Sequence, residues 1–294
     1  MAENKTEGKA AAPRKKKAGS KPDLATIAGL VVAMAGILGG LILEGGKIQD
    51  VSQVTAALIV LGGTLGAVMV TTPLPVLLRS CKKLGAVFMD AAQPPDALIE
   101  EILTYATKAR KHGVVALEQD AAGVTDPFLR KALNLAVDGT DLQELRKMME
   151  LEISLEEQRG EAEAKVYEAA GGYAPTIGII GAVLGLIQVM KHLQNIDEVG
   201  HGIAVAFVAT VYGVASSNLF FLPAGNKLRA RLQQAIQLRE LMLDGVVGIV
   251  EGLNPKLIKV KLEAYTTPAV PAKGKAKKAA APAAAGEPAP AAGA

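Results

Sequence analysis

The hydrophobic residues of this chain are gathered into four long blocks that contain no charged side chain. A helix that crosses a bilayer needs about 20 consecutive, mainly apolar residues. The blocks cover residues 24–43, 54–78, 173–190 and 203–222 and hold 20, 25, 18 and 20 residues. The sequence therefore predicts an integral membrane protein with four transmembrane helices.

The polar segments between and after these blocks also carry apolar residues at helical spacing. Pro94 and Pro95 break the pattern, and Asp96 is expected to cap the helix that follows. Asp126-Pro127 predicts an N-cap followed by a first-turn proline. Residues 140–143, Thr-Asp-Leu-Gln, fit a capping box that opens a long acidic helix running into the third block. No strand pattern is convincing anywhere.

The predicted fold class is an all-α membrane protein with four transmembrane helices and a helical cytoplasmic domain inserted between the second and third. Pro73 and Pro75 are not expected to stop the second helix cleanly, because the helical spacing of apolar residues continues beyond them. The expected organisation is a disordered basic tail (1–22), transmembrane helices 1 and 2 (23–78), a cytoplasmic helical domain (79–172), transmembrane helices 3 and 4 (173–223), a cytoplasmic C-terminal helix (224–264) and a disordered Ala/Pro/Lys tail (265–294).

The distribution of positive charge predicts the orientation in the membrane. Seven Lys/Arg precede the first block and three follow the second within residues 79–83, whereas the two short loops between spans carry one lysine each. By the positive-inside rule both termini and the inserted domain lie in the cytoplasm. The segment from Arg79 to Gly172 holds 12 Lys/Arg and 17 Asp/Glu, a net charge of −5, which argues against nucleic acid as a partner. Cys81 is the only cysteine, so no disulfide forms within the chain.

Both tails are low-complexity tracts that cannot bury enough apolar surface to fold. Their lysines either keep the protein soluble, which is the favoured interpretation, or touch anionic membrane lipid.

No Asp, Glu, Lys, Arg or His side chain lies inside any of the four blocks. Because a protein that relays protons normally needs such a group in the hydrocarbon region, this chain by itself is not a complete ion path. The fourth block nevertheless carries five polar residues, which either bond neighbouring helices together or line a wet cavity. These residues are Thr210, Tyr212, Ser216, Ser217 and Asn218.

Small residues and prolines mark positions where the membrane helices pack closely or bend. Three small-xxx-small pairs allow close backbone approach: Gly36 with Gly40, Gly62 with Gly66, and Gly181 with Gly185. Pro175 and Pro223 lie near the cytoplasmic ends of the third and fourth blocks. They are either a first-turn proline and a helix stop, or a pair of weak points that lets the two helices tilt.

Enzyme chemistry has no support in the sequence. There is no phosphate-binding loop, no HExxH motif and no nucleophile with a plausible base. The three histidines, His112, His192 and His201, are scattered and are not expected to bind a metal. We therefore expect neither an enzyme nor a cofactor or metal site.

Two separate motifs carry a family resemblance. Residues 173–186, YAPTIGIIGAVLGL, resemble the third-helix signature of MotA, the flagellar motor stator proteins of the MotA/TolQ/ExbB ion-channel superfamily. Residues 110–118, RKHGVVALE, resemble the cytoplasmic Arg/Glu motif of that family, and Thr210 and Pro223 have the separation that it shows. The resemblance covers about residues 24–262. TolQ and ExbB have three spans, so the four-span order favours MotA and its PomA-like relatives.

The resemblance implies a stator subunit of the bacterial inner membrane that couples ion flow to torque. MotA-like subunits form a ring of five around two copies of a single-span, peptidoglycan-binding partner of the MotB type, whose membrane aspartate binds the ion. The ring acts on the rotor protein FliG. A TolQ/ExbB-like, proton-driven energiser of an outer-membrane process remains as the alternative.

The resemblance also assigns roles to individual positions. It implies that Pro175 and Pro223 couple protonation of the partner to movement of the cytoplasmic domain, and that Thr210 lies beside the ion path. Ala182 stands where sodium-driven relatives have a threonine, which favours protons, whereas Thr176 and Thr210 leave oxygen ligands that keep sodium open.

Three charged residues correspond to charges that face FliG in the family. They are Arg110 and Glu118, with Glu152 as a further acid. On the residues alone, Arg110 and Glu118 are an ordinary pair of solvated charges. On a continuous helix, side chains eight residues apart would lie about 80° from one another.

Overall fold

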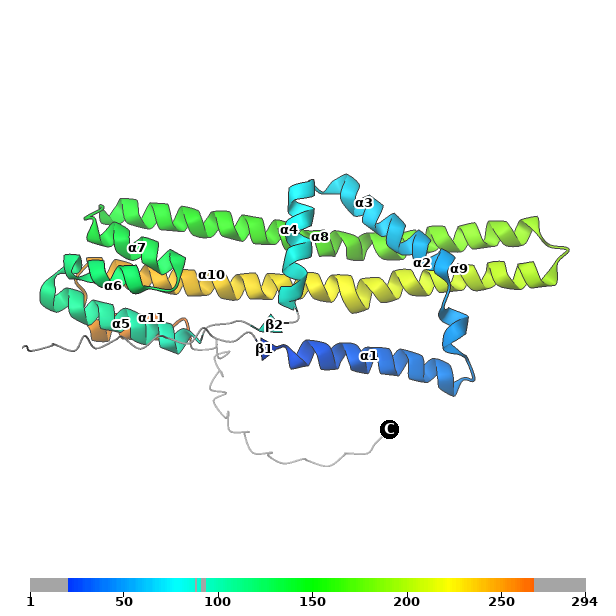
Figure 1. Ribbon diagram of the computed structural model, residues 1–294, viewed down its shortest axis with the longest axis horizontal. Coiled ribbons are helices and arrows are strands. Elements are labelled where there is room, and N and C mark those ends of the chain that lie inside the picture. The colour runs from blue at the N-terminus through cyan, green and yellow to red at the C-terminus, as the bar shows by residue number, and fades with distance from the viewer. Residues whose placement is uncertain (1–20, 88, 91–93, 267–294) are drawn as a thin grey trace, which may run out of the picture.

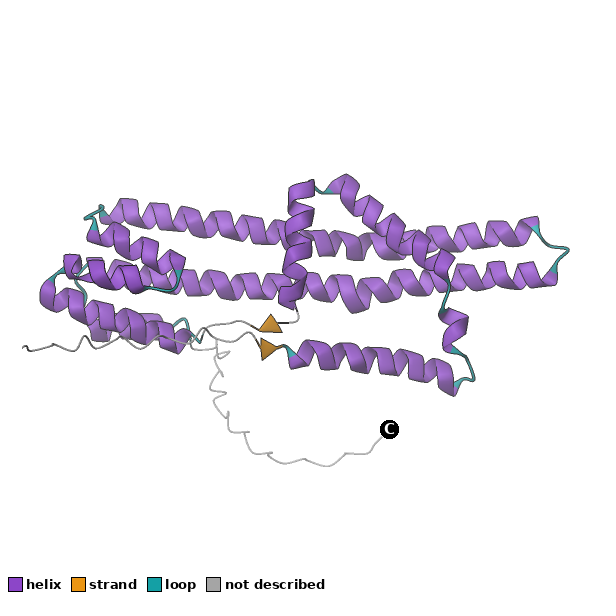
Figure 2. Ribbon diagram, viewed as in Figure 1, coloured by secondary structure: helices purple, strands orange, loops and turns teal. Residues whose placement is uncertain are grey.

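The computed structural model describes residues 21–87, 89–90 and 94–266, and this part of the chain is almost entirely helical (Figures 1 and 2). In chain order its elements are β1 (Lys21–Pro22), α1 (Leu24–Leu43), the 3₁₀ turn η1 (Ile48–Val51), α2 (Val54–Ala57), the π-helical segment η2 (Leu58–Gly62), α3 (Gly63–Thr71), α4 (Leu74–Val87), β2 (Met89–Asp90), α5 (Pro95–His112), the 3₁₀ turn η3 (Val114–Leu117), α6 (Glu118–Gly123), α7 (Pro127–Val137), α8 (Leu142–Lys191), α9 (Ile196–Ser216), the π-helical segment η4 (Ser217–Phe221), α10 (Leu222–Val250) and α11 (Pro255–Glu263). Within the described residues, four helical stretches are long and apolar enough to cross a membrane, as predicted.

Two long antiparallel rods form the spine of the molecule (Figure 1). One is α8, with 50 residues, and the other is the continuous stretch α9–η4–α10, with 55 residues. At 1.5 Å per residue each rod is about 75 Å or more in length, over twice the thickness of the hydrocarbon core. Each rod therefore crosses the membrane and continues into the cytoplasmic domain, which confirms the predicted run of the acidic helix into the third span.

The second transmembrane helix ends earlier than the sequence suggested. It is built from α2, η2 and α3 and stops at Thr71, so the expected continuation to Leu78 is wrong. Pro73 disfavours the helical conformation for the residue before it, and Thr72 is extended, with φ −123° and ψ 130°. The chain restarts at Leu74 as α4, which runs across α8 and α10 rather than along them (Figure 1).

Helix α4 is anchored on α8 close to the expected cytoplasmic end of the third span. The Ser80 hydroxyl is shared between the Val76 carbonyl oxygen of its own helix at 2.9 Å and the Glu163 carbonyl oxygen at 3.2 Å, and the Tyr167 hydroxyl donates to the Ser80 carbonyl oxygen at 2.9 Å. The buried Glu163 carboxylate lies 2.6 Å from Lys83 Nζ. Burial raises the pKa of Tyr167 to about 12. The buried carboxylate and phenol fix where α4 crosses α8.

Helix α1 lies beside the rods and is tied to them at its cytoplasmic end. Asp23 caps α1 by accepting from the Thr26 backbone N–H at 3.2 Å, and it lies 2.5 Å from Lys227 Nζ and 3.3 Å from Arg231 Nη2. The bond from Lys227 holds the pKa of Asp23 well below its usual range. These contacts join the start of α1 to α10.

A two-residue antiparallel pair, β1 with β2, lies beside this junction and is the one departure from helical structure among the elements that the structure describes. It includes Lys21 and Pro22, which the sequence assigned to the disordered N-terminal tail. The rest of that tail, and all of the predicted C-terminal tail except residues 265 and 266, lies outside the described residues.

The cytoplasmic domain packs α5, α6, α7 and α11 against the ends of α8 and α10 (Figure 1). Its core is made of fully buried aliphatic and methionine side chains from all of these elements. Among them are Ile102, Leu117, Leu129, Leu133, Leu145, Met149, Leu241, Ile258 and Leu262. The expected single C-terminal helix is two helices, because α10 ends at Val250 and Gly252, with φ +70°, turns the chain into α11.

The predicted helix starts in this domain were partly right. Asp126 caps α7 as expected, accepting from the Phe128 and Leu129 N–H groups. The cap of α8 is Asp141 rather than Thr140, so the expected capping box is wrong. Helix α5 begins at Pro95, which places Asp96 inside the first turn instead of at the cap. The error is a shift of one or two positions in each case.

Candidate functional site

Small residues bring the two rods into backbone contact within the membrane. A Cβ placed on Gly185 would lie 2.8 Å from the Gly202 carbonyl oxygen, and one placed on Gly213 would lie 2.6 Å from the Ala174 carbonyl oxygen. The predicted close packing at Gly181 and Gly185 is therefore present. At the other two pairs, Gly36 with Gly40 and Gly62 with Gly66, a Cβ would meet nothing within 4 Å in this protomer.

The second transmembrane helix covers one side of this α8–α9 pair. Ile177 of α8 packs against Gly63 of α3, where an added Cβ would lie 2.7 Å from Ile177 Cγ2. On α9, Val208 and Ala209 form a buried cluster with Ala56 and Val60 of the same second span. The opposite side of the pair is not covered by the described part of the chain, and Ile179, Phe207 and Val214 are exposed there. We call that side the open face of the α8–α9 pair.

Three of the predicted site residues lie along the margin of the open face. Pro175 and Ala182 are seven residues apart on α8, so they point within about 20° of the same direction. Thr210 follows Ala209 on the side of α9 that turns away from the second span. Its hydroxyl donates to the Ala206 carbonyl oxygen at 3.2 Å. All three are half-buried, and the close contacts of Gly178 and Gly213 hold Thr210 and Pro175 within about one helical turn of each other.

Thr176 does not join them. Its side chain is exposed, and its hydroxyl donates to the Tyr173 carbonyl oxygen of its own helix at 2.8 Å. Two positions after the buried Ala174, it points about 200° away from the contact with α9. Within one protomer, Thr176 is therefore apart from Thr210 and Ala182.

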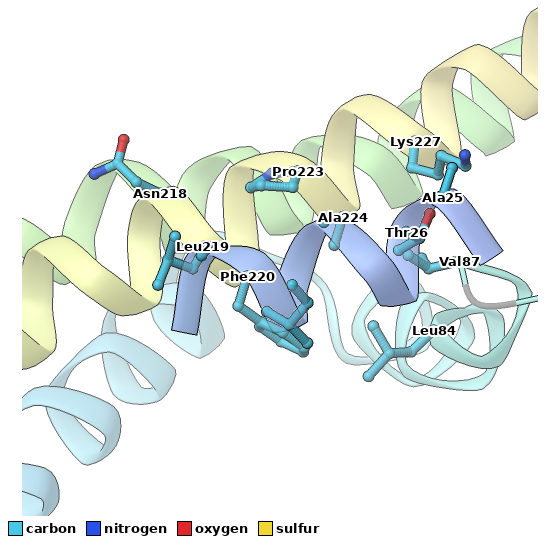
Figure 3. A pocket seen from close by; sticks show the side chains of 13 residues that line it. Ala25, Thr26, Leu84, Val87, Asn218, Leu219, Phe220, Pro223, Ala224 and Lys227 are labelled. Atoms are coloured by element: carbon cyan, nitrogen blue, oxygen red, sulfur yellow. The ribbon is translucent and has the colours of Figure 1, made fainter. Parts of the chain in front are cut away.

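Pro223 lies two residues beyond a distortion in the other rod. Residues 217–221 form the π-helical segment η4, and Pro223 follows at the start of α10. Pro223 lines a cleft of about 360 Å³ between α1, α4 and this junction. Figure 3 shows Pro223 and Lys227 among the labelled side chains that line it. A proline lacks a backbone donor, and a π segment is a local departure from the α-helical pattern of hydrogen bonds. The rod is therefore least regular where it leaves the membrane.

The end of α5 and the start of α6 lie at the end of the cytoplasmic domain that is farthest from the transmembrane helices (Figure 1). Arg110 is in the last turn of α5 and Glu118 is the first residue of α6. Both are exposed. Gly113, with φ +83°, breaks the chain between them, so they are not on a continuous helix. This tip presents both charges to solvent.

Glu152 is placed differently from these two. It lies on α8, about 15 Å along the rod from Leu142 at 1.5 Å per residue. Its carboxylate accepts from Lys131 Nζ of α7 at 2.6 Å and is half-buried. Glu152 therefore joins two helices of the domain and does not belong to the charged tip.

At the opposite end of the rods, a small polar group closes the α8–α9 hairpin. His192 Nε2 lies 3.3 Å from Glu198 Oε2, and Asn195 donates to the same carboxylate at 3.0 Å. Within the described ranges, no three His, Cys, Asp or Glu side chains come close enough to hold a metal ion.

Sequence reasoning missed the anchoring role of Glu163, and it left Ser217 open between a bond to a neighbouring helix and the lining of a wet cavity. Glu163 is one of many acids on α8, and its burial becomes visible only when α4 is in place. Ser217 was noted only as one polar residue among five, but its hydroxyl donates to the Gly171 carbonyl oxygen of the other rod at 2.6 Å. The sequence did not indicate which residue Ser217 would bond, because Ser217 and Gly171 are 46 positions apart in the chain.

Comparison with known proteins places this architecture among ion-driven motor proteins. Residues 120–241 match the MotA/TolQ/ExbB proton channel family, and residues 27–113 match the family described as Motility protein A N-terminal. Motility protein A of Bacillus subtilis (strain 168) is 36% identical over 260 residues, covering 87% of this chain and 93% of the relative. The chemotaxis protein PomA of Vibrio alginolyticus is 35% identical over 243 residues, covering 83% and 95%.

Two solved structures have the same fold. The C. jejuni MotAB structure has a TM-score of 0.80 at 32% identity and covers 85% of this chain and 98% of the matched chain. The flagellar MotAB stator complex of Bacillus subtilis has a TM-score of 0.77 at 35% identity, covering 83% and 96%. The similarity spans the membrane helices and the cytoplasmic domain.

Proposed function

The chain belongs to the MotA/TolQ/ExbB proton channel family, and from this premise we propose that it is a stator subunit of a bacterial flagellar motor. With a single-span partner of the MotB type, it couples ion flow across the inner membrane to torque on the rotor. The observation that carries the proposal is an open face, lined by Pro175, Ala182 and Thr210, in a chain whose four apolar blocks contain no Asp, Glu, Lys, Arg or His. An ion path needs such a group, so the partner's helix supplies it at this face.

The transported ion in this proposal is the proton. Ala182 offers no hydroxyl that could replace part of a sodium ion's hydration shell, whereas a proton that binds a carboxylate needs no such ligand. Motility in sodium-free medium that a protonophore abolishes would support proton coupling. Motility that requires sodium and survives the protonophore would contradict it. The variant Ala182→Thr tests whether this position contributes to ion choice.

Charge neutralisation on the partner is proposed to move the rods at Pro175 and Pro223. Because α8 is continuous from Pro175 back to Leu142, it forms a lever of about 50 Å, and a tilt of about 5° at the proline displaces its far end by about 4 Å. Each proton that crosses supplies about 2.3 kcal/mol per 100 mV of membrane potential. Pro175→Ala should therefore lower torque without preventing membrane assembly. Full torque in that variant would contradict the coupling role.

The charged tip is the proposed contact with the rotor protein FliG. Arg110 and Glu118 are exposed at the end of the lever, and individually weak, salt-sensitive contacts suit a surface that must engage and release at every step. Arg110→Glu and Glu118→Lys should abolish or strongly slow swimming while the complex assembles normally. Glu152, which the Lys131 ion pair holds, is proposed to act by positioning α8, so Glu152→Gln should have a smaller effect.

Assembly follows from the surfaces that one protomer leaves uncovered. The glycines at 36, 40, 62 and 66 have open space around them, and α1 is exposed along its length. We propose that neighbouring copies of the chain cover them in a homopentameric ring around two partner chains. In this proposal the complex lies in the bacterial inner membrane, surrounded by lipid, and the charge distribution supports a cytoplasmic position for both termini.

A complementation experiment tests the whole proposal. The chain is expressed together with a single-span partner of the MotB type in a motile strain that lacks its own stator. Restored swimming, together with copurification of the two chains, is the expected result. Ion conduction by the purified chain without any companion would contradict the central argument, because the spans would then contain a complete path of their own.

A further inference from the structure

Pro175 leaves a carbonyl oxygen of α8 without its usual donor. In an α-helix the N–H of residue 175 would bond to the carbonyl of Gly171, four residues earlier, but proline has no N–H. A backbone carbonyl that stays unpaired in a dry, apolar environment costs several kcal/mol. A membrane helix with an internal proline therefore needs a substitute donor at this position.

That donor comes from the other rod. The Ser217 hydroxyl donates to the Gly171 carbonyl oxygen at 2.6 Å, and Ser217 is only 2% exposed. The other aliphatic hydroxyls described in the last two spans bond within their own helix: Thr176 to Tyr173, Thr210 to Ala206 and Ser216 to Gly213. The Ser217 bond is distinguished from them because it crosses between the rods and repairs the defect that Pro175 creates.

The position of Ser217 links two irregular segments. It is the first residue of the π-helical segment η4, and Pro223 follows just beyond the end of that segment. The rods also touch here through their backbones, since a Cβ placed on Gly171 would lie 2.5 Å from Leu222 Cδ2 and 3.5 Å from the Leu222 backbone nitrogen. A single hydrogen bond thus joins the break in α8 to the distorted turn of α9–α10.

From this geometry we propose that Ser217 is a positioning residue for torque generation, a latch that makes the segments around Pro175 and Pro223 move as one unit. The inference rests on the proposed stator function. The Gly213 carbonyl, which lies four residues earlier in the helix of Ser217, already accepts the Ser216 hydroxyl and the Ser217 backbone N–H, so it offers the Ser217 hydroxyl no free acceptor. A movement that separates Ser217 from Gly171 therefore leaves the Gly171 carbonyl without its donor. The hydroxyl therefore biases the rods toward one arrangement and resists any tilt that separates Gly171 from Ser217.

The test compares single-residue variants in the full complex with its partner chain. Ser217→Ala removes the donor, Ser217→Thr keeps it, and Ser216→Ala is the matched control because that hydroxyl bonds only within its own helix. Three quantities are measured: the amount of assembled complex in the membrane, the torque on a bead attached to a flagellum, and the proton flux into vesicles that contain the complex.

For Ser217→Ala we expect wild-type assembly with the ratio of torque to proton flux lowered about fivefold or more, the factor that corresponds to the smallest cost of an unpaired buried carbonyl. Ser217→Thr should restore most of the ratio, and Ser216→Ala should match the wild type. A structural role alone would lower torque and flux together with the amount of complex, and that result would overturn the inference. A wild-type ratio in Ser217→Ala would overturn it as well.

The same experiment separates this inference from the proposed function. If the wild-type complex rotates the flagellum and Ser217→Ala does so equally well, the latch is refuted and the stator function stands. If the wild-type complex gives neither torque nor proton flux, the stator function is refuted and the latch is refuted with it.

Discussion

The contact between the two rods at Gly213 allows one stability prediction to be worked through. A Cβ on this residue would lie 2.6 Å from the Ala174 carbonyl oxygen, 3.1 Å from Gly178 Cα and 3.2 Å from Pro175 Cα. All three atoms belong to the backbone of α8, so no side chain can rotate away. The closest contact is about 0.8 Å shorter than ordinary van der Waals distance, and only separation of the rods relieves it.

We therefore expect Gly213→Ala to destabilise the protein. Overpacking in a close-packed interface costs about 1–3 kcal/mol, and the absence of any flexible neighbour favours the upper part of that range. Alanine recovers about 1 kcal/mol of helix propensity, which leaves a net loss of about 1–2 kcal/mol. For a chain of this size the loss corresponds to a melting temperature lower by about 2–8 °C. Circular dichroism of the purified complex in detergent measures this temperature.

The matched control is Gly200→Ala, on the same helix. A Cβ on Gly200 would meet nothing within 4 Å, so the substitution gains helix propensity without overpacking and should leave the melting temperature unchanged or raise it. If Gly213→Ala melted at the same temperature as Gly200→Ala or higher, the backbone contact between α8 and α9 would be refuted as the basis of the packing.

Three further outcomes follow from the cytoplasmic half of the molecule. Lys83→Met leaves the buried Glu163 carboxylate without its nearest cation. Because Lys83 is about half exposed, we expect the substitution to lower the free energy of unfolding by only about 1–2 kcal/mol. Hydrogen exchange in α4 should become faster in this variant, whereas Lys82→Met should leave the exchange rate unchanged. Asp126→Ala removes the cap of α7 and should cost about 0.5–2 kcal/mol in thermal unfolding, while Asp126→Asn should retain most of the stability. Burial raises the pKa of Tyr167 to about 12, so its stabilising contribution is complete below pH ~10 and is lost as the pH rises toward 12. In an absorbance titration at alkaline pH, the Tyr167→Phe variant should therefore lack one phenol that ionises near pH 12 in the wild type.

The sequence alone determined the number of spans, their order and the helical class of the inserted domain. Long uncharged blocks have few physical solutions, because a bilayer forces every backbone group to bond within a helix or a closed barrel. The N-cap of α7 at Asp126 could also be predicted from the sequence, because capping is an interaction between neighbours in the chain. The end of the second span was read wrongly because the apolar pattern continued past Pro73, although Thr72 adopts the extended conformation that a following proline favours.

The candidate site, too, has features that the sequence predicts and features that only the structure shows. The sequence named Pro175, Pro223 and Thr210, because a proline or a hydroxyl in an apolar block is visible by composition. Only the tertiary structure decided which positions meet: Ser217 reaches Gly171 across 46 residues, and Glu163 becomes a buried anchor when α4 crosses α8. Interactions such as helix capping depend on neighbouring residues and can be predicted from the sequence. The pairing of distant groups depends instead on how the two rods pack, and that packing is determined by many small contacts at once.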